Sequence, residues 1–442
     1  MPLIIIILAA GKGTRMCSDL PKVMHNIAGR PMLSWVLERA EQLDPAQIIV
    51  VTAPGMDDVA KLASSHTIAV QQEQKGTADA VKAAIPYMKH DEGNVLILLG
   101  DEPLLPLSAL QEMVHEDEPT AMALRTENPK GLGRMIEGNE RKLLRIVEEK
   151  DASKAEKDIN LCNAGNYCLN YDLLLKWLPE IDSDNVQHEY YLTDLAEIAR
   201  KDDLPFKIVE VEVSHVWGVN NRVQLAEHEA HVQAELRLNA MANGVTMIDP
   251  GSVFLSWDTE FGKDVVIEPN VFFGPGVKIG DHVTICAFSH LETAHVSAKC
   301  RIGPFARLRP GSELDEGVRI GNFVEVKNAQ LGKGVKANHL GYIGDAIVGA
   351  DTNFGCGAIT VNYDGFEKHQ TKIGFNVMVG SNANLVAPVT IEDNAFIAAG
   401  STITHDVPRG ALALSRPETE IEDGWVMKYR ERKTLIKAKR EG

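Results

Sequence analysis

Residues 373–403 read IGFNVMVGSNANLVAPVTIEDNAFIAAGSTI, and a bulky aliphatic side chain returns in this stretch at every sixth position. Six is not a helical period, and it fits short strands that occupy the three faces of a coil in turn. This repeat is typical of a parallel β-helix, in which each coil buries its apolar side chains only by stacking on its neighbours. The positions in this register are Ile373, Val379, Leu385, Ile391, Ile397 and Ile403.

The same step begins well before this stretch, so we expect the β-helix to fill most of the second half of the chain. Around residues 332–344 the step is lost, it resumes briefly at Val348 and Phe354, and residues 361–370 then form an insertion. Insertions in a solenoid become loops on one face, which is often the binding face. The upstream positions of the main register are Ile267, Phe273, Ile279, Ile285, Leu291, Ile302, Leu308, Leu314, Ile320 and Val326, and a second register two residues earlier holds Val265, Val271, Val277, Val283, Val318 and Val324.

The composition limits the class of protein. A chain of 442 residues has room for two to three domains of about 150 residues each, and its 44% hydrophobic and 24% charged residues are ordinary for a soluble globular protein. The formal net charge of −17 argues against nonspecific nucleic-acid binding, although local Lys and Arg side chains can still hold phosphate ligands. The six cysteines lack metal-binding spacing such as CxxC, which predicts reduced thiols and a cytoplasmic setting.

The first half alternates strand-like and helix-like segments, which predicts a mostly parallel sheet covered by helices. Residues 3–8 form an apolar run with no basic residue before it, too short to span a membrane, and we interpret it as a buried strand rather than part of a signal peptide. Further strands are expected at residues 48–51 and 95–99. A helix is expected over residues 31–43, where apolar side chains recur at helical spacing.

Residues 224–242 predict a connecting helix, because they are rich in Ala, Leu, Glu and Gln and are followed by Asn-Gly. The predicted organisation is a Rossmann-like α/β domain with helices on both faces of the sheet (residues 1–222), a linker helix (residues 223–243) and a β-helix domain (residues 244–442). The β-helix domain ends in a basic tail that we expect to be loosely ordered.

A glycine-rich loop follows the first predicted strand directly, in Leu8-Ala9-Ala10-Gly11-Lys12-Gly13-Thr14-Arg15-Met16. Glycines let the backbone approach an anionic group, and successive N–H groups can then cradle phosphate oxygens. A tight turn of an α/β fold would look similar, and the spacing matches neither a P-loop nor GxGxxG. Asp101 stands at the exit of a buried strand, where open α/β sheets bind ligands, although an Asp there is also a common turn former.

Together, LAAGKGTRM, PKVMH at residues 21–25, GTA at residues 76–78 and the GD of residues 100–101 resemble the sugar-1-phosphate nucleotidyltransferases. In detail they are most similar to the uridylyltransferase half of bacterial N-acetylglucosamine-1-phosphate uridylyltransferases. The resemblance implies attack of a sugar phosphate oxygen on the α-phosphorus of UTP and departure of pyrophosphate, so that the protein supplies alignment and charge but no nucleophile. Two departures, Leu99 where relatives can carry Tyr and Asp79 where His is common, would alter packing around the base and sugar.

The resemblance also implies roles for individual residues of this first site. Arg15 and Lys22 would stabilise the triphosphate, and Asp101 and Asn220 would bind Mg²⁺, a hard cation that prefers oxygen ligands. The nucleotide would be held by Leu8, Ala9, Ala10, Gly11, Lys22, Gln71, Gly76 and Thr77, and N-acetylglucosamine 1-phosphate by Gly133, Glu148, Asn163 and Asn220.

A second site is predicted where the six-residue step is interrupted. His339 lies in this interruption, and although a lone histidine is more often structural than catalytic, Tyr342 and the insertion follow it at short range. The segments at residues 302–310, 322–327 and 336–342 closely resemble the acetyltransferase half of the same bifunctional enzymes. A left-handed β-helix follows from that resemblance alone, because parallel crossovers are right-handed in about 98% of cases.

By this resemblance, His339 is the general base that removes a proton from the 2-amino group of glucosamine 1-phosphate as the amine attacks the thioester of acetyl-CoA. The cosubstrate would lie between neighbouring subunits of a homotrimer, and Cys356 would serve packing. Arg309, Lys327 and Lys368 would hold the sugar phosphate, with Tyr342, Asn353 and Asn362 around the sugar; Asn362 is also assigned to the acetyl-CoA site, together with Tyr363, Ser381, Ala399 and Arg416.

The resemblance covers nearly the whole chain and predicts a bifunctional enzyme that acetylates glucosamine 1-phosphate and then makes UDP-N-acetylglucosamine for cell-wall and lipopolysaccharide precursors. Its partners would be these small molecules and further copies of the chain, with no nucleic acid and no membrane. One alternative is a single-activity nucleotidyltransferase whose β-helix only trimerises or regulates, and His339 with Lys368 and Arg309 argues against it. The other is a scaffold without chemistry, against which Lys22 and Asp101 argue.

Overall fold

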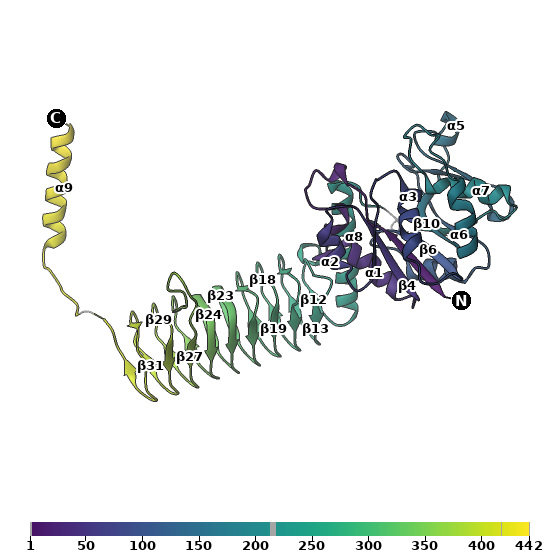
Figure 1. Cartoon of the computed structure of the whole chain (residues 1–442). Coiled ribbons are helices and arrows are strands. Elements are labelled where there is room, and N and C mark those ends of the chain that lie inside the picture. The colour runs from purple at the N-terminus through teal and green to yellow at the C-terminus, as the bar shows by residue number, and fades with distance from the viewer. Residues whose placement is uncertain (1, 213–217, 417, 442) are drawn as a thin grey trace. The chain divides into compact units, whose positions relative to one another are not determined.

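The computed structural model describes residues 2–212, 218–416 and 418–441 (Figure 1). The contacts divide the chain into two compact units. The first unit runs to Asn239 and includes Leu255–Trp257, and the second consists of Ala240–Phe254 and the chain from Asp258 onward. No helix in the described ranges is both long enough and apolar enough to cross a membrane.

The first unit is built on one large sheet that is mostly parallel. Its main path has the order β11 (Lys207–Val211), β7 (Thr120–Arg125), β10 (Leu161–Asn170), β6 (Asn94–Leu99), β1 (Leu3–Leu8), β4 (Gln47–Thr52) and β5 (Thr67–Val70), with β8 (Arg134–Glu137) and β9 (Leu143–Val147) branching from β10. β1 pairs parallel with both β4 and β6, whereas β10 runs antiparallel to β6 and β7. The strands predicted at residues 3–8, 48–51 and 95–99 are thus confirmed as β1, β4 and β6.

The side chains of β1 alternate between two cores, one on each face of the sheet. Ile4 and Ile6 join the core that contains α3 (Thr77–Ala84), α6 (Tyr171–Trp177) and α7 (Leu195–Lys201). Ile5 and Ile7 join the opposite core, with α1 (Met32–Glu41), α2 (Asp57–Leu62) and α4 (Leu107–His115). All four isoleucines are 0% exposed, as expected for a parallel strand covered on both faces. The prediction of helices on both faces is confirmed.

α8 (Arg222–Ala242) is the helix predicted for residues 224–242, and most of it packs within the first unit. Val232 joins a small core with Met16, Ile27 and Met32. The amide of Gln233 donates to the backbone carbonyl of Leu255 (2.6 Å) and accepts from its N–H (2.9 Å). These two bonds explain why a short later segment of the chain belongs to the first unit.

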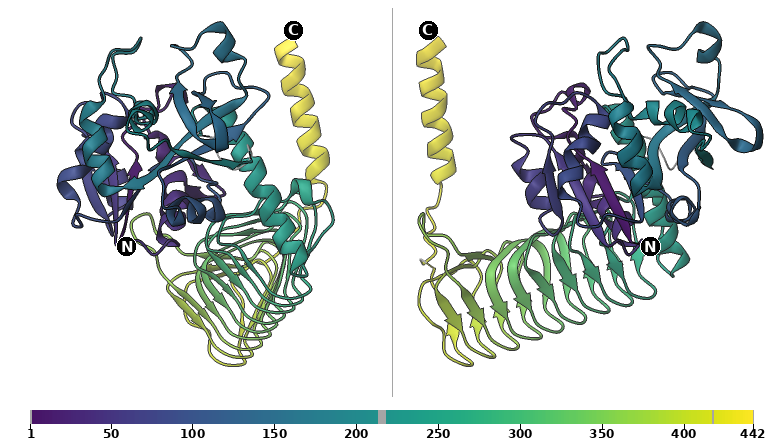
Figure 2. Two further views of the ribbon diagram at one scale, coloured as in Figure 1. Left: turned by 90° about the vertical axis from the view of Figure 1, so that its right-hand side faces the viewer. Right: turned by 45° about the vertical axis from the view of Figure 1, so that its right-hand side comes forward.

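The second unit is a stack of short parallel strands, which superimpose as a triangular outline in the left panel of Figure 2. The strands form three ladders. The first ladder holds β12 (Thr246–Met247), β14 (Val266–Ile267), β17 (Thr284–Ile285), β20 (Arg301–Ile302), β25 (Asn353–Phe354), β28 (Met378–Val379), β31 (Phe396–Ile397) and β33 (Leu412–Ala413). The second holds β15 (Phe272–Phe273), β18 (His290–Leu291), β21 (Arg307–Leu308), β26 (Ile359–Val361), β29 (Asn384–Val386) and β32 (Thr402–Ile403). The third holds β13 (Glu260–Phe261), β16 (Lys278–Ile279), β19 (Ala294–Val296), β22 (Ser312–Leu314), β27 (Thr371–Ile373) and β30 (Val389–Ile391).

The predicted aliphatic register is confirmed, because its members point into the stack and pair with one another from coil to coil. Ile267 pairs with Ile285, and Ile285 pairs with Ile302. All three are 0% exposed. Two longer strands, β23 (Arg319–Leu331) and β24 (Lys336–Val348), run through all three ladders at the centre of the stack.

The loss of the six-residue step around residues 332–344 is not a break in the coil. Ile320 pairs with Ala337, and Ala337 pairs with Phe354, so these two coils are each slightly shorter than the coil that separates Ile267 from Ile285. The shortening shifts the sequence pattern while the strands continue. The insertion at residues 361–370 does leave the stack, because the coil that separates Phe354 from its partner Val379 is much longer than its neighbours.

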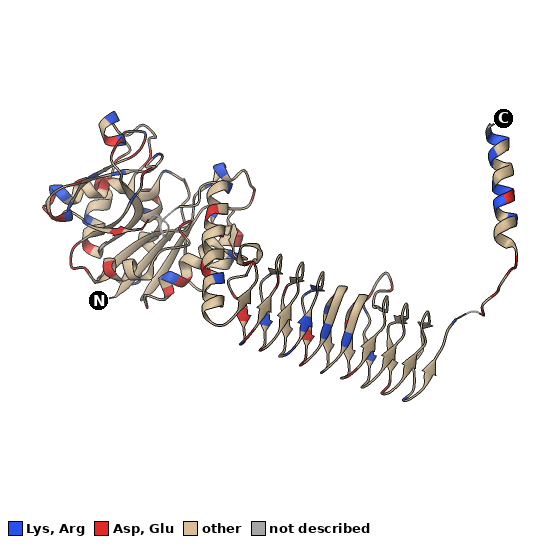
Figure 3. Ribbon diagram, turned by 180° about the vertical axis from the view of Figure 1, so that it is seen from behind, with Lys and Arg blue, Asp and Glu red and all other residues tan. Residues whose placement is uncertain are grey.

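The basic tail, expected to be loosely ordered, forms the helix α9 (Trp425–Glu441). Its side chains are exposed as far as Arg440. Lys and Arg predominate along it, as the blue segments of Figure 3 show.

Candidate active sites

The carboxyl ends of β1 and β6 meet at one edge of the sheet, at the point where the strand order reverses and open α/β sheets bind ligands. The glycine-rich loop leaves β1 here. Its start is fixed to neighbouring strands, because Gly100 N–H donates to the Leu8 carbonyl (2.9 Å) and Ala9 N–H donates to the Val51 carbonyl (2.8 Å). A side chain built on Gly11 would meet none of the described residues within 4 Å, so the loop backbone is open to a ligand.

Gln71, Gly76 and Thr77 lie in one hydrogen-bonded turn at the start of α3. The Gln71 amide donates to the Gly76 carbonyl (3.1 Å) and to Asp79 Oδ2 (2.7 Å), and Thr77 Oγ1 accepts from Leu192 N–H (3.0 Å). Asp79, one of the two sequence departures, therefore orients a residue assigned to the nucleotide. The structure brings these three assigned residues together.

The side chains assigned to the metal and the triphosphate form one cluster. The Lys22 ammonium contacts Asp101 Oδ2 and donates to Asn220 Oδ1 (3.2 Å), and Arg15 Nη2 donates to the same amide oxygen (2.8 Å). A carboxylate oxygen and an amide oxygen thus already share one cation, the donor set that suits Mg²⁺ together with substrate phosphates. The described residues contain no group of three or more His, Cys, Asp and Glu side chains placed to bind a metal, so a divalent ion here would depend on Asp101, Asn220 and the substrates.

Three of the four residues assigned to N-acetylglucosamine 1-phosphate also meet, with Gly133 just before β8, Glu148 just after β9 and Asn163 on β10, whereas Asn220 lies in the cluster with Lys22. Asn163 N–H donates to the Gly133 carbonyl (2.9 Å), and a side chain built on Gly133 would lie 3.3 Å from Glu148 Oε1. The Asn163 side chain is fixed by Tyr167, whose hydroxyl donates to its Oδ1 (3.1 Å). Burial raises the pKa of Glu148, and the charges of Asp151 and Asp194 act in the same direction. The structure therefore assembles a small polar site around Gly133.

A buried polar pair at this edge was not found from the sequence. Asn166 Nδ2 donates to Glu102 Oε2 (2.5 Å), and Asn166 Oδ1 accepts from Leu99 N–H (3.2 Å). Burial, with the neighbouring charge of Asp101, raises the pKa of Glu102 well above its usual range. The one sequence signal was the second carboxylate directly after Asp101. Leu99, the other departure, covers Gly165, where an added side chain would lie 2.5 Å from Leu99 Cδ1.

In the second unit, His339, Ser381 and Ala399 follow one corner of the stack, whereas Asn362 and Tyr363, also assigned to acetyl-CoA, lie in the insertion. Gly357 N–H donates to the His339 carbonyl (3.4 Å), Asn382 N–H donates to the Cys356 carbonyl (2.8 Å), and Gly400 N–H donates to the Ser381 carbonyl (2.8 Å). The corner therefore runs from His339 through Ser381 to Ala399 on successive coils. Arg416 is close to its far end, 3.8 Å from a side chain built on Gly400. Because neighbouring strands lie about 4.8 Å apart, the three steps span about 14 Å.

His339 is oriented by a residue on the preceding coil. Its Nδ1 lies 3.1 Å from Asn322 Oδ1, and the two residues face each other in the pairing of β23 with β24. An amide oxygen only accepts hydrogen bonds, so Nδ1 carries the proton and Nε2 keeps a free lone pair. The imidazole is solvent-exposed. Asn322 was not assigned from the sequence, and its place one coil length before His339 is the signal that would have found it.

Three cations gather farther along the same coils. The ammonium of Lys368, with added repulsion from Arg309, lowers the pKa of Lys327. Arg309 Nη1 also donates to Glu325 Oε1 (2.7 Å). Like charges this close favour an anionic ligand between them, and phosphate oxygens accept such charge-assisted hydrogen bonds well.

The insertion holds Lys368 near this group. Tyr363 bridges to Lys368 in a small antiparallel turn, and His369 N–H donates to the Asn362 carbonyl (2.8 Å). The Asn362 amide donates to the Tyr342 hydroxyl (3.4 Å) and to Asp345, a residue that was not assigned from the sequence. Asn353 is the exception among the sugar residues. It lies on the first ladder opposite Lys336, whereas Tyr342 lies on the second.

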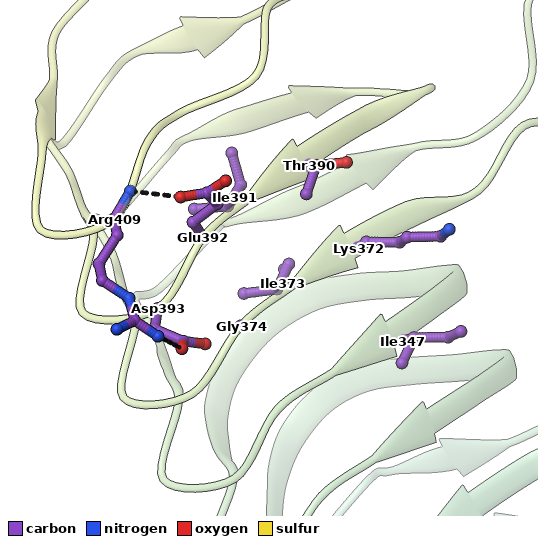
Figure 4. Close-up of a pocket in the computed structure, with 9 residues that line it drawn as sticks. All are labelled: Ile347, Lys372, Ile373, Gly374, Thr390, Ile391, Glu392, Asp393 and Arg409. Atoms are coloured by element: carbon purple, nitrogen blue, oxygen red, sulfur yellow. Dashed lines mark hydrogen bonds and ion pairs between the residues drawn. The ribbon is translucent and has the colours of Figure 1, made fainter.

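A separate hollow of about 490 Å³ lies on the third ladder and contains none of the residues assigned from the sequence (Figure 4). Ile347, Lys372 and Thr390 line its floor, and the Arg409 guanidinium closes one side by donating to Asp393 (2.6 Å). The charges of Arg409 and Asp393 are paired in this way, whereas Lys327 and Lys368 repel each other.

The two units match two different families of known proteins. Residues 5–158 match the MobA-like NTP transferase domain family, and residues 258–293 and 370–405 match the bacterial transferase hexapeptide (six repeats) family. The chain is 45% identical over 442 residues to the bifunctional protein GlmU of Zymomonas mobilis subsp. mobilis, with 98% of each chain covered. It is 48% identical over 438 residues to the bifunctional protein GlmU of Azorhizobium caulinodans, with 97% of each chain covered. The chain belongs to the GlmU family of bifunctional proteins.

Membership of the GlmU family confirms a bifunctional transferase, in which the nucleotidyltransferase unit carries uridylyl transfer and the hexapeptide unit carries acetyl transfer. The stack is a left-handed parallel β-helix of hexapeptide repeats. Membership of this family implies a role in cell-wall peptidoglycan synthesis. The alternatives of a single-activity enzyme and of an inactive scaffold are not retained.

Proposed function

We propose that the two activities use the two clusters described above, with acetylation of glucosamine 1-phosphate first and uridylyl transfer to N-acetylglucosamine 1-phosphate second. The observation that carries this proposal is that each compact unit has its own cation group. Arg15 and Lys22 contact the side chains of Asp101 and Asn220 in the first unit, and Lys327 lies on the strand paired with that of His339 in the second, with Lys368 acting on it from the insertion.

In the acetyl-transfer site, Nε2 of His339 accepts a proton from the 2-amino group as the amine nitrogen attacks the thioester carbonyl carbon. The carbon–sulfur bond then breaks as the amide bond forms, and the proton held by His339 passes to the departing sulfur, so that coenzyme A leaves as a thiol. Asn322 keeps Nε2 in the accepting tautomer. Arg309, Lys327 and Lys368 hold the phosphate, and acetyl-CoA lies along the corner from His339 to Arg416.

In the uridylyl-transfer site, an oxygen of the sugar phosphate attacks the α-phosphorus of UTP, and the bond to the pyrophosphate oxygen breaks. The open loop backbone around Gly11 binds the nucleotide, and Lys22 and Arg15 neutralise charge on the phosphates. Gly133, Glu148 and Asn163 hold the amino sugar. Asp101 and Asn220 would hold Mg²⁺, which would supply neutralisation of charge on the substrate phosphates.

We propose further that the chain forms a homotrimer in the cytoplasm. An apolar strip is exposed on the corner that continues from His339, where Phe288, Phe305 and Phe323 stack with ring centroids 4.9 and 5.2 Å apart. These rings are 53%, 45% and 55% exposed in the single chain, and association of further copies would cover them. All six cysteines are free thiols, which supports a reducing compartment.

The test separates the two sites by mutation and follows pyrophosphate and free thiol in parallel. Asp101→Ala should abolish pyrophosphate release and leave acetyl transfer within a fewfold of wild type. His339→Ala should lower acetyl transfer by about two to four orders of magnitude, the usual contribution of general acid–base catalysis, and leave uridylyl transfer unchanged. EDTA should stop uridylyl transfer alone. Equal loss of both activities in a folded Asp101→Ala protein would contradict the two-site assignment.

A further inference from the structure

A second carboxylate faces the cation cluster of the first unit. Glu102 follows Asp101, is only 3% exposed, and has one oxygen, Oε2, bound to Asn166. The other oxygen points toward the cluster. A side-chain carbon built on Gly218 would lie 3.9 Å from Glu102 Oε1, 3.4 Å from Asp101 Oδ2 and 3.7 Å from Asn220 Nδ2. Three polar side chains therefore border the position that a side chain on Gly218 would occupy.

The position of this carboxylate is fixed. Asn166, which is 0% exposed, holds Glu102 Oε2 at 2.5 Å and is itself held by the N–H of Leu99 at the end of β6. Burying a carboxylate and an amide in a core is costly, and apolar side chains of similar volume would pack there at least as stably. A buried, anchored carboxylate beside a metal-binding residue thus points to a task at that site.

The two carboxyl groups also lie beside the same cations. The Lys22 ammonium contacts Asp101, and Arg15 donates to Asn220 (2.8 Å). We propose that Glu102 is a further positioning residue of the cation site, supplying a second carboxylate that strengthens binding of the divalent ion held by Asp101 and Asn220. This inference rests on the proposed metal site.

The experiment measures Mn²⁺ affinity of the full chain from the electron paramagnetic resonance signal of free Mn²⁺ at physiological salt, with and without UTP. Glu102→Gln keeps an oxygen that can accept from Asn166 and removes only the charge. It should weaken Mn²⁺ binding by about 10- to 100-fold, the usual effect of removing a group that supports metal ligands. The matched control Asn166→Ala keeps the charge and removes the hydrogen bond, and it should change the affinity less than Glu102→Gln does.

Asp101→Ala serves as the reference for the site itself. Loss of Mn²⁺ binding in Asp101→Ala with unchanged affinity, within twofold, in Glu102→Gln would overturn the role of Glu102 and leave the metal site intact. Unchanged affinity in Asp101→Ala would overturn the metal site and with it this inference. Thermal unfolding shows whether each variant is folded. Should Glu102→Gln not fold, the double substitution Glu102→Val with Asn166→Val replaces the polar pair by packed apolar side chains and should show the same loss of affinity.

Discussion

Replacing Gly76 by alanine should damage the first site through the backbone alone. Gly76 has φ of 117° and ψ of 177°, a conformation that is essentially restricted to glycine. An added Cβ would lie 2.4 Å from the carbonyl oxygen of Tyr190, far closer than real contacts allow. The turn that carries Gln71 and Thr77 must therefore shift when any side chain is added here.

The size of the effect follows from this geometry. Placing a residue other than glycine in so sparsely populated a region costs of the order of 1–3 kcal/mol, to which the contact with Tyr190 adds. In a unit of this size about 1 kcal/mol lowers the melting temperature by roughly 2–4 °C. The transition of the first unit should thus fall by about 2–12 °C. Uridylyl transfer should fall with it, because the nucleotide turn is displaced.

Gly11→Ala is the matched control, because a Cβ there meets none of the described residues within 4 Å. It should leave the melting temperature nearly unchanged and raise the KM for UTP, since the new methyl group occupies space proposed for the nucleotide. Calorimetry of the full chain, with pyrophosphate and thiol release measured in parallel, distinguishes the two variants. A Gly76→Ala protein with the wild-type melting temperature and full uridylyl transfer would refute the argument, and acetyl transfer should be normal in both.

Three further outcomes are expected. Lys368→Gln should raise the KM for glucosamine 1-phosphate about tenfold or more without changing that for acetyl-CoA, and NMR titration should show the pKa of Lys327 returning upward, because Lys368 lowers it. Burial raises the pKa of Asp194 to about 6, so its contribution to stability is complete below about pH 4 and is lost as the pH rises through 6. Asp194→Asn should therefore raise the melting temperature of the first unit at about pH 7.5 but not at about pH 4; equal shifts at both would contradict this pKa. A fragment beginning at Asn243 should fold and sediment as a trimer, and a folded monomer with full acetyl transfer would count against a site between subunits.

The repeat region shows how far periodicity alone can lead. Every residue of the six-residue register is buried in the stack, as predicted. The period follows directly from the lengths of the strand and the turn. The prediction of an interruption at residues 332–344 was wrong, because slightly shorter coils shift the sequence pattern there while the strands continue. The spacing of apolar residues in the sequence indicates which side chains are buried. It no longer indicates where the strands lie when a turn is one residue shorter.

In the first unit, individual strands could be predicted, but their pairing and the contacts between side chains could not. Buried parallel strands appear in the sequence as apolar runs, so β1, β4 and β6 were found. The pairing of β10 with β6 was not, because two antiparallel strands that lie far apart in the sequence leave no shared signal in either segment. Glu102 and Asn166 are joined only through that pairing, and no local pattern marks Asn166 as the partner of a carboxylate.

The second unit differs, because its contacts can be obtained by adding one coil length to a residue number. Asn322 meets His339, Asn328 meets Asp345 and Lys299 meets Glu316, all at the same separation in the sequence. Once the length of a given coil is known, polar partners across it can be sought in the sequence at that separation, and the group that orients His339 becomes predictable. The same search fails in the first unit, where separation in sequence carries no fixed relation to separation in space. The contacts around a site on a solenoid can therefore be predicted from one sequence in more detail than the contacts around a site at the edge of an α/β sheet.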